Sequence, residues 1–325
     1  MALGWTLALA LALVLGGLTT AARADGAVVI CHGSLAAAQV PLAGIEGYYA
    51  AEGLDVQTRF YPSGFQALAA MLAGDCSLST AAVPPVVYQS LRRDDFRILA
   101  ALSHSGDYER ILARRDRGIA TPADLRGHRI AVARATSAHY FLDMFLAAHG
   151  LTPSDVNQVF LPAAEVGPAL LSGAVDAAAH WEPNIRDLSR ELGDRAQVLG
   201  FSGLVVSPFL LLVREAFVDA SPGVVRGILL ALLRADRTMA EVPDEAARRL
   251  APSYGVSAED FNFVSSLHDF GLRIDQPLPF VLENAARWQI GLLPAAERPP
   301  MPNFTNLIDA RPLRALRPQS VTLVD

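Results

Sequence analysis

The sequence predicts an α/β protein that is built from two lobes. From Ala27 onward, short apolar runs alternate with segments of helical periodicity, which is typical of parallel β-α-β units. The chain has 325 residues, 52% of them hydrophobic, and roughly 300 residues exceed the usual size of a single core. A faint repeat of helix, glycine stop, strand and proline-started helix, at residues 67–84 and again at 169–183, also favours two similar lobes.

The first lobe is expected to begin with a buried strand at residues 27–31. A helix follows from Pro41 to Gly53, because proline is tolerated in a first helical turn and glycine often follows the last. Residues 54–61 alternate apolar and polar, which predicts a half-buried strand near a sheet edge. A helix is expected from Ser63 to Gly74, and further strands of this sheet at residues 76–82, 96–102 and 110–113.

A second set of α/β elements follows Thr121, where a hydroxyl cap and a first-turn proline mark a short helix. Strands are expected at residues 129–133, 156–161 and 175–180, with a helix at 137–149. A strand at 209–213 precedes a mostly helical tail, with helices at 221–239, 244–250, 258–270 and 279–288. A tail with so few strands cannot form a third α/β lobe. We therefore expect lobe 1 at residues 25–115 plus 207–325, and lobe 2 at 116–206.

Residues 1–24 are expected to be a secretory signal peptide. An apolar run at residues 5–18 is too short for a comfortable membrane span, and Ala22-Arg23-Ala24 has the small-x-small form of a cleavage site. Export to the periplasm follows, with a retained N-terminal anchor as the alternative. Cys31 follows Val-Val-Ile and lacks the sequence that precedes a lipidated cysteine.

Charge and cysteine content restrict the function further. The formal net charge is −6, and losing Arg23 with the leader changes it to −7 (−6 − 1). An acidic chain without a basic stripe argues against a nucleic-acid partner. Cys31 and Cys76 could form a disulfide in an oxidising compartment, but the predicted strands place them at opposite strand ends, which favours two buried thiols.

Polar residues follow several predicted strands, where ligands bind in open α/β sheets. They are His32, Gly33, Ser34, Ser63, Gly64, Thr136 and Ser137. At helix starts, free N–H groups favour an anionic or polar oxygen, although Ser, Thr and Gly there usually serve only as caps. His104, His139 and His180 pair with no second ligand at a recognised metal spacing, so no metal is expected.

Residues 180–183, His-Trp-Glu-Pro, place an aromatic ring and an acid just after a strand. Trp181 is either core packing or a pocket wall that covers the apolar part of a ligand. Glu182 is either a helix-dipole complement or a ligand contact, and as a contact it favours an amine or a ring N–H over a bare anion.

An ordered set of short motifs resembles one known family. The motifs are Gly47-Tyr48-Tyr49, Glu52-Gly53-Leu54-Asp55-Val56, Ser63-Gly64, Asp124-Leu125-Arg126-Gly127, Ala135-Thr136-Ser137, Gly150-Leu151-Thr152 and Trp181-Glu182-Pro183. The chain resembles, over nearly all of residues 27–320, the nitrate, sulfonate and taurine type of ABC-importer substrate-binding protein, which is related to thiamine-pyrimidine-precursor binders. The motifs are specific for the family and not for the ligand.

The resemblance implies a type II periplasmic-binding-protein fold, with two lobes, a hinge and a ligand in the central cleft. The ligand contacts of that family fall at positions that match Ser34, Gly64, Thr80, Thr136, Ser137 and Trp181. We keep Glu182 as a further candidate. The implied function is capture of a small polar or anionic molecule, such as a sulfonate, taurine or nitrate, by a periplasmic monomer that needs no cofactor and delivers the molecule to an importer permease.

Two other functions remain open. Some relatives on this fold make a pyrimidine with pyridoxal phosphate, but that cofactor needs a lysine and the chain has none. No nucleophile elbow or phosphate-cradling loop occurs either. A sensor ectodomain would use the same cleft to report ligand occupancy, and a retained N-terminal run would favour it.

Overall fold

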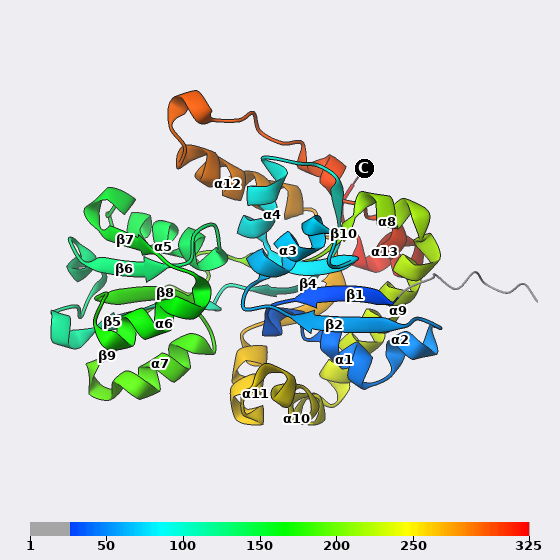
Figure 1. Cartoon of the computed structure of the whole chain (residues 1–325), viewed down its shortest axis with the longest axis horizontal. Helices are drawn as coiled ribbons and strands as arrows, with labels where there is room; N and C mark the ends of the chain where they lie inside the picture. The colour runs from blue at the N-terminus through cyan, green and yellow to red at the C-terminus, as the bar shows by residue number, and fades with distance from the viewer. Residues whose placement is uncertain (1–26, 325) are drawn as a thin grey trace, which may run out of the picture.

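The computed structural model describes residues 27–324, so the signal peptide expected at residues 1–24 lies outside this part. Two lobes, each built around one β-sheet, lie side by side (Figure 1). This two-sheet α/β architecture confirms the predicted fold class. None of the helices in the described range is long and apolar enough to cross a membrane.

The first lobe contains a six-stranded sheet with the order β11-β4-β10-β3-β1-β2. Its strands are β1 (Val28–His32), β2 (Val56–Phe60), β3 (Leu78–Ala82), β4 (Phe96–Ser105), β10 (Ser207–Arg214) and β11 (Asp269–Arg273). β1 pairs in parallel with β2 and β3, whereas β10 is antiparallel to both of its neighbours. The helices of this lobe are α1 (Gln39–Ile45), α2 (Tyr48–Ala51), α3 (Gly64–Ala73), α4 (Val83–Ser90), α8 (Glu215–Ala220), α9 (Pro222–Glu241), α10 (Pro243–Tyr254), α11 (Ala258–Ser266), α12 (Leu278–Gly291) and α13 (Arg311–Leu316).

The second lobe contains a five-stranded sheet with the order β7-β6-β8-β5-β9. Its strands are β5 (Glu109–Arg114), β6 (Arg129–Val132), β7 (Asn157–Phe160), β8 (Ala177–Trp181) and β9 (Ala196–Leu199), and its helices are α5 (Ser137–Ala148), α6 (Ala163–Ser172) and α7 (Asn184–Leu192). Buried residues form one core cluster with Phe141 and Phe145 of α5 and another with Leu170 and Leu188 of α6 and α7.

Two segments connect the sheets, residues 106–108 between β4 and β5 and residues 200–206 between β9 and β10. They lie against each other, because the Gly203 N–H donates to the Gly106 carbonyl at 3.0 Å. The prediction that the strand near residues 110–113 continues the first sheet, with the chain leaving near Arg115, is wrong. β5 instead pairs with β8 and β9 of the second sheet, because an apolar run identifies a strand but not its partners.

Two local predictions are also wrong. The helix expected from Pro41 to Gly53 is divided into α1 and α2, because Gly47 adopts a φ of 69°. The helix expected at residues 258–270 ends with α11, and β11 follows and pairs with β4. Gly271, with a φ of 150°, lies within β11.

Cys31 and Cys76 form a disulfide, with Cα atoms 6.0 Å apart, so the expectation of two buried thiols is wrong. Cys31 lies in β1, and Cys76 lies two residues before β3, which pairs directly with β1. Opposite strand ends in the sequence are close in space because these two strands are neighbours in the sheet. The disulfide therefore links β1 to the segment that leads into β3.

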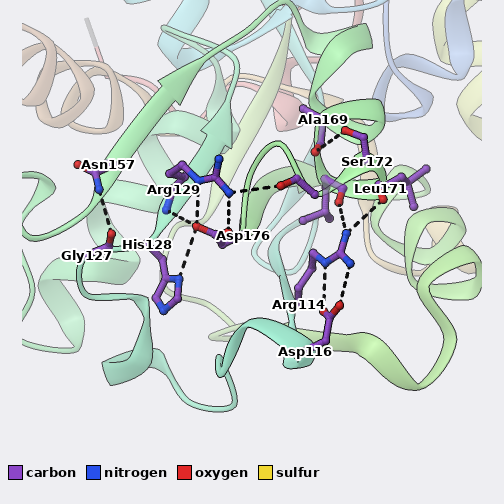
Figure 2. Close-up of polar contacts among 12 residues, drawn as sticks. Arg114, Asp116, Gly127, His128, Arg129, Asn157, Ala169, Leu171, Ser172 and Asp176 are labelled. Carbon is purple, nitrogen blue, oxygen red and sulfur yellow. Dashed lines mark hydrogen bonds and ion pairs between the residues drawn. The ribbon is translucent and has the colours of Figure 1, made fainter.

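Ion pairs fix the far end of the second sheet, opposite the first lobe (Figure 2). The Asp176 carboxylate, just before β8, accepts from the Arg129 main-chain N–H at 3.0 Å and from its guanidinium at 2.9 Å. These hydrogen bonds lower the pKa of Asp176 to about 2. Arg114 at the end of β5 binds Asp116 and the carbonyls of Leu170 and Leu171. These contacts thus join β6 to the start of β8 and the end of β5 to the end of α6.

Candidate ligand-binding site

Three turns that follow strands meet between the two sheets, and each carries a hydroxyl cap. Ser34 follows β1, Ser63 follows β2 and Thr136 follows β6. Each side-chain oxygen accepts a main-chain hydrogen bond from two or three residues further along the chain. The first N–H groups of a helix have no intrahelical partners, so α3 of the first lobe and α5 of the second both begin at this junction with free donors.

A cavity of about 20 Å³ lies at this junction and is lined by residues from both lobes. The lining residues are Gly33, Ser34, Ser63, Gly64, Phe65, Ala82, Pro85, Tyr108, Thr136, Ser137, Trp181 and Phe209. A recess of about 290 Å³ adjoins it and shares Ser63, Phe65 and Thr136 as wall residues. The recess also contains Tyr88, Leu161, Pro162 and Arg134, whose guanidinium lies 3.6 Å from the centre of the Phe160 ring.

Two glycines allow the turns to approach one another. A β-carbon on Gly33 would lie 2.6 Å from the Ser63 carbonyl carbon, and one on Gly64 would lie 2.9 Å from the Ala81 α-carbon. Both neighbours are main-chain atoms, which cannot rotate away. Glycine at these positions is therefore required to bring the start of α3 against β1 and β3.

The structure brings five of the seven sequence-predicted residues together. Ser34, Gly64, Thr136, Ser137 and Trp181 all line the cavity. Trp181 is half-buried, lines the cavity and packs against core residues of both lobes. That these five residues bind a ligand stays a prediction.

Thr80 and Glu182 are placed elsewhere. Thr80 is fully buried within β3, and its hydroxyl has no hydrogen-bond partner among residues 27–324. The Glu182 carboxylate accepts from the Arg186 main-chain N–H at 3.1 Å, in the first turn of α7. Neither residue is part of the cavity wall. A side chain after a strand can turn toward the adjacent helix, and Glu182 takes this helix-complement orientation.

Sequence reasoning missed Tyr108, which lies in one of the connecting segments. Its hydroxyl is 3.0 Å from the Ser34 hydroxyl, so it joins the connecting segment to the first-lobe turn. Burial raises its pKa, and the neutral hydroxyl is the relevant form. Phe65 and Phe209, also missed, supply apolar walls. Aromatic residues in a strand and a helix look like ordinary core positions in sequence, so no local signal distinguished them.

Glu109, at the start of β5, was also missed. Its side chain is buried, with 5% of the residue surface exposed, and it lines a second cavity of about 20 Å³ beside the first. Burial raises its pKa, and a hydrogen bond with Ser137 and the charge of Arg110 oppose that effect. The sequence does contain a signal for Glu109, because an acidic residue is unusual in an apolar strand. An ionisable group in a buried strand is a candidate functional residue.

The three histidines considered for a metal lie in separate places. Burial lowers the pKa of His104 and of His180 to about 4, and it also lowers that of His139. Within residues 27–324, no group of three or more His, Cys, Asp or Glu side chains is placed to hold a metal ion. The His180 ring instead accepts the Trp181 N–H at 2.9 Å, which orients the cavity wall.

The lobes touch on one side of the cavity through α12 and α5. The Trp288 indole N–H donates to the Asp143 carboxylate at 2.8 Å, and its ring lies edge-on to His139 with centres 4.9 Å apart. Gln158 donates to the other Asp143 oxygen at 2.6 Å. The His139 ring in turn accepts the Ala135 N–H at 3.3 Å. This cluster therefore connects the first lobe to the turn that carries Thr136.

The lobes touch on the opposite side through α7 and α11. Arg186 and Arg190 of α7 bind Asp260 of α11, at 3.0 and 2.8 Å, and Arg186 also binds Glu259 at 3.0 Å. The Arg186 guanidinium lies 4.5 Å from the centre of the Phe263 ring. Figure 1 shows α5 and α12 along the upper side of the boundary between the lobes, and α7 and α11 along the lower side. The cavity thus lies between two interlobe contacts.

Comparison with known proteins identifies the family. The family described as NMT1/THI5 like matches residues 37–246. The chain is 28% identical, over 199 residues, to a putative aliphatic sulfonates-binding protein of Escherichia coli K12, covering 61% of this chain and 62% of that one. It is 26% identical to the taurine-binding periplasmic protein of the same organism, covering 59% and 60%. The chain therefore spans about three fifths of the length of these curated relatives.

Solved structures share the fold. The alkanesulfonate-binding protein of Xanthomonas axonopodis pv. citri superposes with a TM-score of 0.75 at 22% identity, covering 87% of this chain and 98% of that one. A desulfurization enzyme also shares the fold, with a TM-score of 0.64 at 18% identity, covering 90% and 99%. The fold thus occurs in both binding proteins and an enzyme. The family match and the two-lobed architecture together show that this chain belongs to the NMT1/THI5-like family and has the fold of periplasmic binding proteins.

Proposed function

We propose that the protein captures a small anionic or polar molecule between its two lobes. The observation that carries this proposal is that α3 and α5, one from each lobe, begin at the same cavity. Free N–H groups and the helix dipole favour an anion at each start, and among the described residues no Arg lines this cavity. Main-chain donors and hydroxyls from both lobes would therefore hold the anionic group.

Capture requires the lobes to move. A cavity of about 20 Å³ has room for about one water molecule, so a ligand with several heavy atoms enters this cavity only when the lobes separate. The paired segments at Gly106 and Gly203 are suited to act as the hinge, since few residues absorb the rotation. Contacts from both lobes are complete only in the closed state, so ligand binding shifts the population toward it.

We further propose delivery to a membrane importer from the periplasm. The names of the relatives support periplasmic binding, since they describe an aliphatic sulfonates-binding protein and a taurine-binding periplasmic protein. A permease that recognises the closed, monomeric form would take up the ligand. Mass determination of the exported product tests the localisation: loss of residues 1–24 supports a free periplasmic protein, and a retained leader supports a membrane-anchored receptor.

We propose that binding proceeds without catalysis. Pyridoxal phosphate chemistry needs a lysine, which the chain lacks. Both of its cysteines are in the disulfide and so offer no thiolate nucleophile. The groups around the cavity are hydroxyls, main-chain amides and aromatic rings, which suit recognition. A recovered ligand that is chemically unchanged after long incubation would support this proposal.

A thermal-shift screen tests the capture of a small molecule. Taurine, alkanesulfonates, nitrate and pyrimidine precursors are the ligands to compare, and at 100 times its dissociation constant a ligand adds about 2.7 kcal/mol of stability. An Ala82→Phe variant fills the cavity and should lose the shift, whereas Ala295→Phe at an exposed position should keep it. A shift that survives in Ala82→Phe would place binding outside the cavity.

A further inference from the structure

A second cavity continues the ligand-binding cavity toward the strand that carries Glu109. The two cavities share four wall residues, Ala82, Tyr108, Ser137 and Phe209. The second is also lined by Glu109, Ser105, Ser207 and His268. It is therefore the inner end of one interlobe site, and its chemistry differs from that of the helix starts because it contains a carboxyl group.

Glu109 has no ion-pair partner among residues 27–324. Arg110, whose charge acts on Glu109, binds Asp107 at 3.0 Å and the Glu109 carbonyl at 2.8 Å instead. His268 lines the same cavity, but burial lowers its pKa to about 4 and its ring is hydrogen-bonded to the Val264 carbonyl, so it is neutral at pH 7. A buried carboxylate without a cation is costly, and groups of this kind concentrate at functional sites.

The site thus has two poles of opposite character. The N-termini of α3 and α5 favour negative charge, while Glu109, behind Ser137, favours positive charge or a strong donor. A bare anion would satisfy only the first pole and would place its charge near the carboxylate. A short molecule with an anionic group at one end and an ammonium group at the other would satisfy both.

We propose that Glu109 is the recognition site for a protonated amine, so that the ligand is a short zwitterion such as an aminosulfonate or a β-amino acid. This inference rests on the proposed capture function and adds the second charged group of the ligand. The alternative role for Glu109 is purely structural: its contact with Ser137 would complement the dipole of α5 without any ligand. The two roles differ in whether the residue discriminates between ligands.

Titration calorimetry with matched ligands separates these roles. Taurine and 2-hydroxyethanesulfonate have the same length and differ in ammonium against hydroxyl, and β-alanine and 3-hydroxypropanoate form the same pair for a carboxylate. In the pair that binds the wild-type chain more tightly at pH 7.5, the amine should bind at least about tenfold more tightly than the matching alcohol. This is the size of effect expected for a charge-assisted hydrogen bond. Glu109→Gln should reduce the ratio of the two affinities to within about threefold, mainly by weakening the binding of the amine.

A matched control is Asp236→Asn, which removes a half-buried carboxyl group from α9 of the first lobe, away from the cavity. Burial raises the pKa of Asp236 to about 6, and its partners are Gln39 and Leu272. This variant should keep the wild-type ratio, and melting temperatures of both variants show that they fold. A Glu109→Gln variant that loses stability and keeps the ratio would establish the structural role and overturn the proposal.

The remaining outcomes distinguish the two proposals. Equal affinity for the amine and hydroxyl members of both pairs would overturn the amine site and leave anion capture intact. Binding of ethanesulfonate or nitrate without binding of either amine would do the same. No binding of any of these anions or zwitterions would contradict the proposed capture function itself.

Discussion

Trp288 of the first lobe and Asp143 of the second are joined by a hydrogen bond of 2.8 Å across the boundary between the lobes. Asp143 is almost fully buried, with 3% of its surface exposed, so the indole N–H satisfies a carboxylate that has lost most of its water. The bond exists only while the lobes are together. In the proposed capture mechanism, closure would thus be stabilised by contacts outside the cavity as well as by the ligand.

Trp288→Phe should weaken ligand binding about tenfold while changing the free energy of unfolding much less. The variant keeps an aromatic ring against His139 but removes a hydrogen bond to a charged group, which is worth about 1.5–3 kcal/mol in the closed state. Apparent affinity scales with the closed population. Calorimetry with the ligand found in the screen checks this, and Phe280→Ser, at an exposed position of α12, is the control. Unchanged affinity in Trp288→Phe would show that this bond does not set closure.

Arg190→Gln should weaken binding about two- to threefold at low ionic strength, with the difference vanishing in high salt. Arg190 joins α7 to Asp260 of α11, but its side chain is half exposed and exposed pairs contribute little. Arg287→Gln removes a comparable pair with Glu283 inside α12 and should have no effect. A salt-independent loss of affinity in Arg190→Gln would contradict an electrostatic contact.

Gly33→Ala should lower the free energy of unfolding by about 1–3 kcal/mol and weaken ligand binding. The new β-carbon would meet the Ser63 carbonyl carbon at 2.6 Å, and overpacking against main chain costs about this much. Gly223→Ala in α9 meets nothing within 4 Å and should be neutral or slightly stabilising. Urea unfolding of both variants provides the measurement. Equal stability of the two would mean that the turns are not tightly packed.

Stability should fall as the pH decreases below 6.5. Burial lowers the pKa of His32, His104, His180 and His268 from 6.5 to about 4. Between these values the unfolded chain binds more protons than the folded chain, so acid favours unfolding. The melting temperature should fall by at least about 5 °C between pH 7 and pH 5. His180→Gln should reduce this slope; a flat profile in the wild type would contradict the argument.

Replacing both cysteines by alanine should lower the free energy of unfolding by about 4 kcal/mol. The disulfide spans 45 residues, and closing such a loop restricts the unfolded chain by about that amount. Ligand affinity should be nearly unchanged, because neither cysteine lines the cavity. Calorimetric unfolding measures the first effect. A variant as stable as the wild type would contradict the structural role of the disulfide.

The spacing of apolar residues and the positions of Gly, Pro and capping residues predicted most strands and helices, because these signals are local. The partners of β5 were not predicted, because pairing with β8 and β9 depends on residues far along the chain. The disulfide was not predicted for the same reason, since only the pairing of β1 with β3 brings Cys31 and Cys76 together. β11 was missed because a short strand next to a helix shows no separate period.

The residues of the candidate site also fall into two groups: those that local sequence predicts and those that only the three-dimensional fold places. Ser34, Thr136 and Ser137 lie at helix starts after strands, and both features are readable in sequence. Tyr108 and Glu109 lie where the chain passes between the sheets, and their place in the cavity follows from the three-dimensional crossing. Glu182 has the expected position after β8, but its side-chain direction, toward α7, is a property of packing.

Small-angle scattering of the mature protein tests the central claim, that a small molecule is captured by closure of the two lobes. The radius of gyration should decrease when the ligand from the screen is added to saturation, and it should decrease less in Trp288→Phe at the same subsaturating ligand concentration. An identical radius of gyration with and without saturating ligand in the wild-type chain would contradict capture by closure.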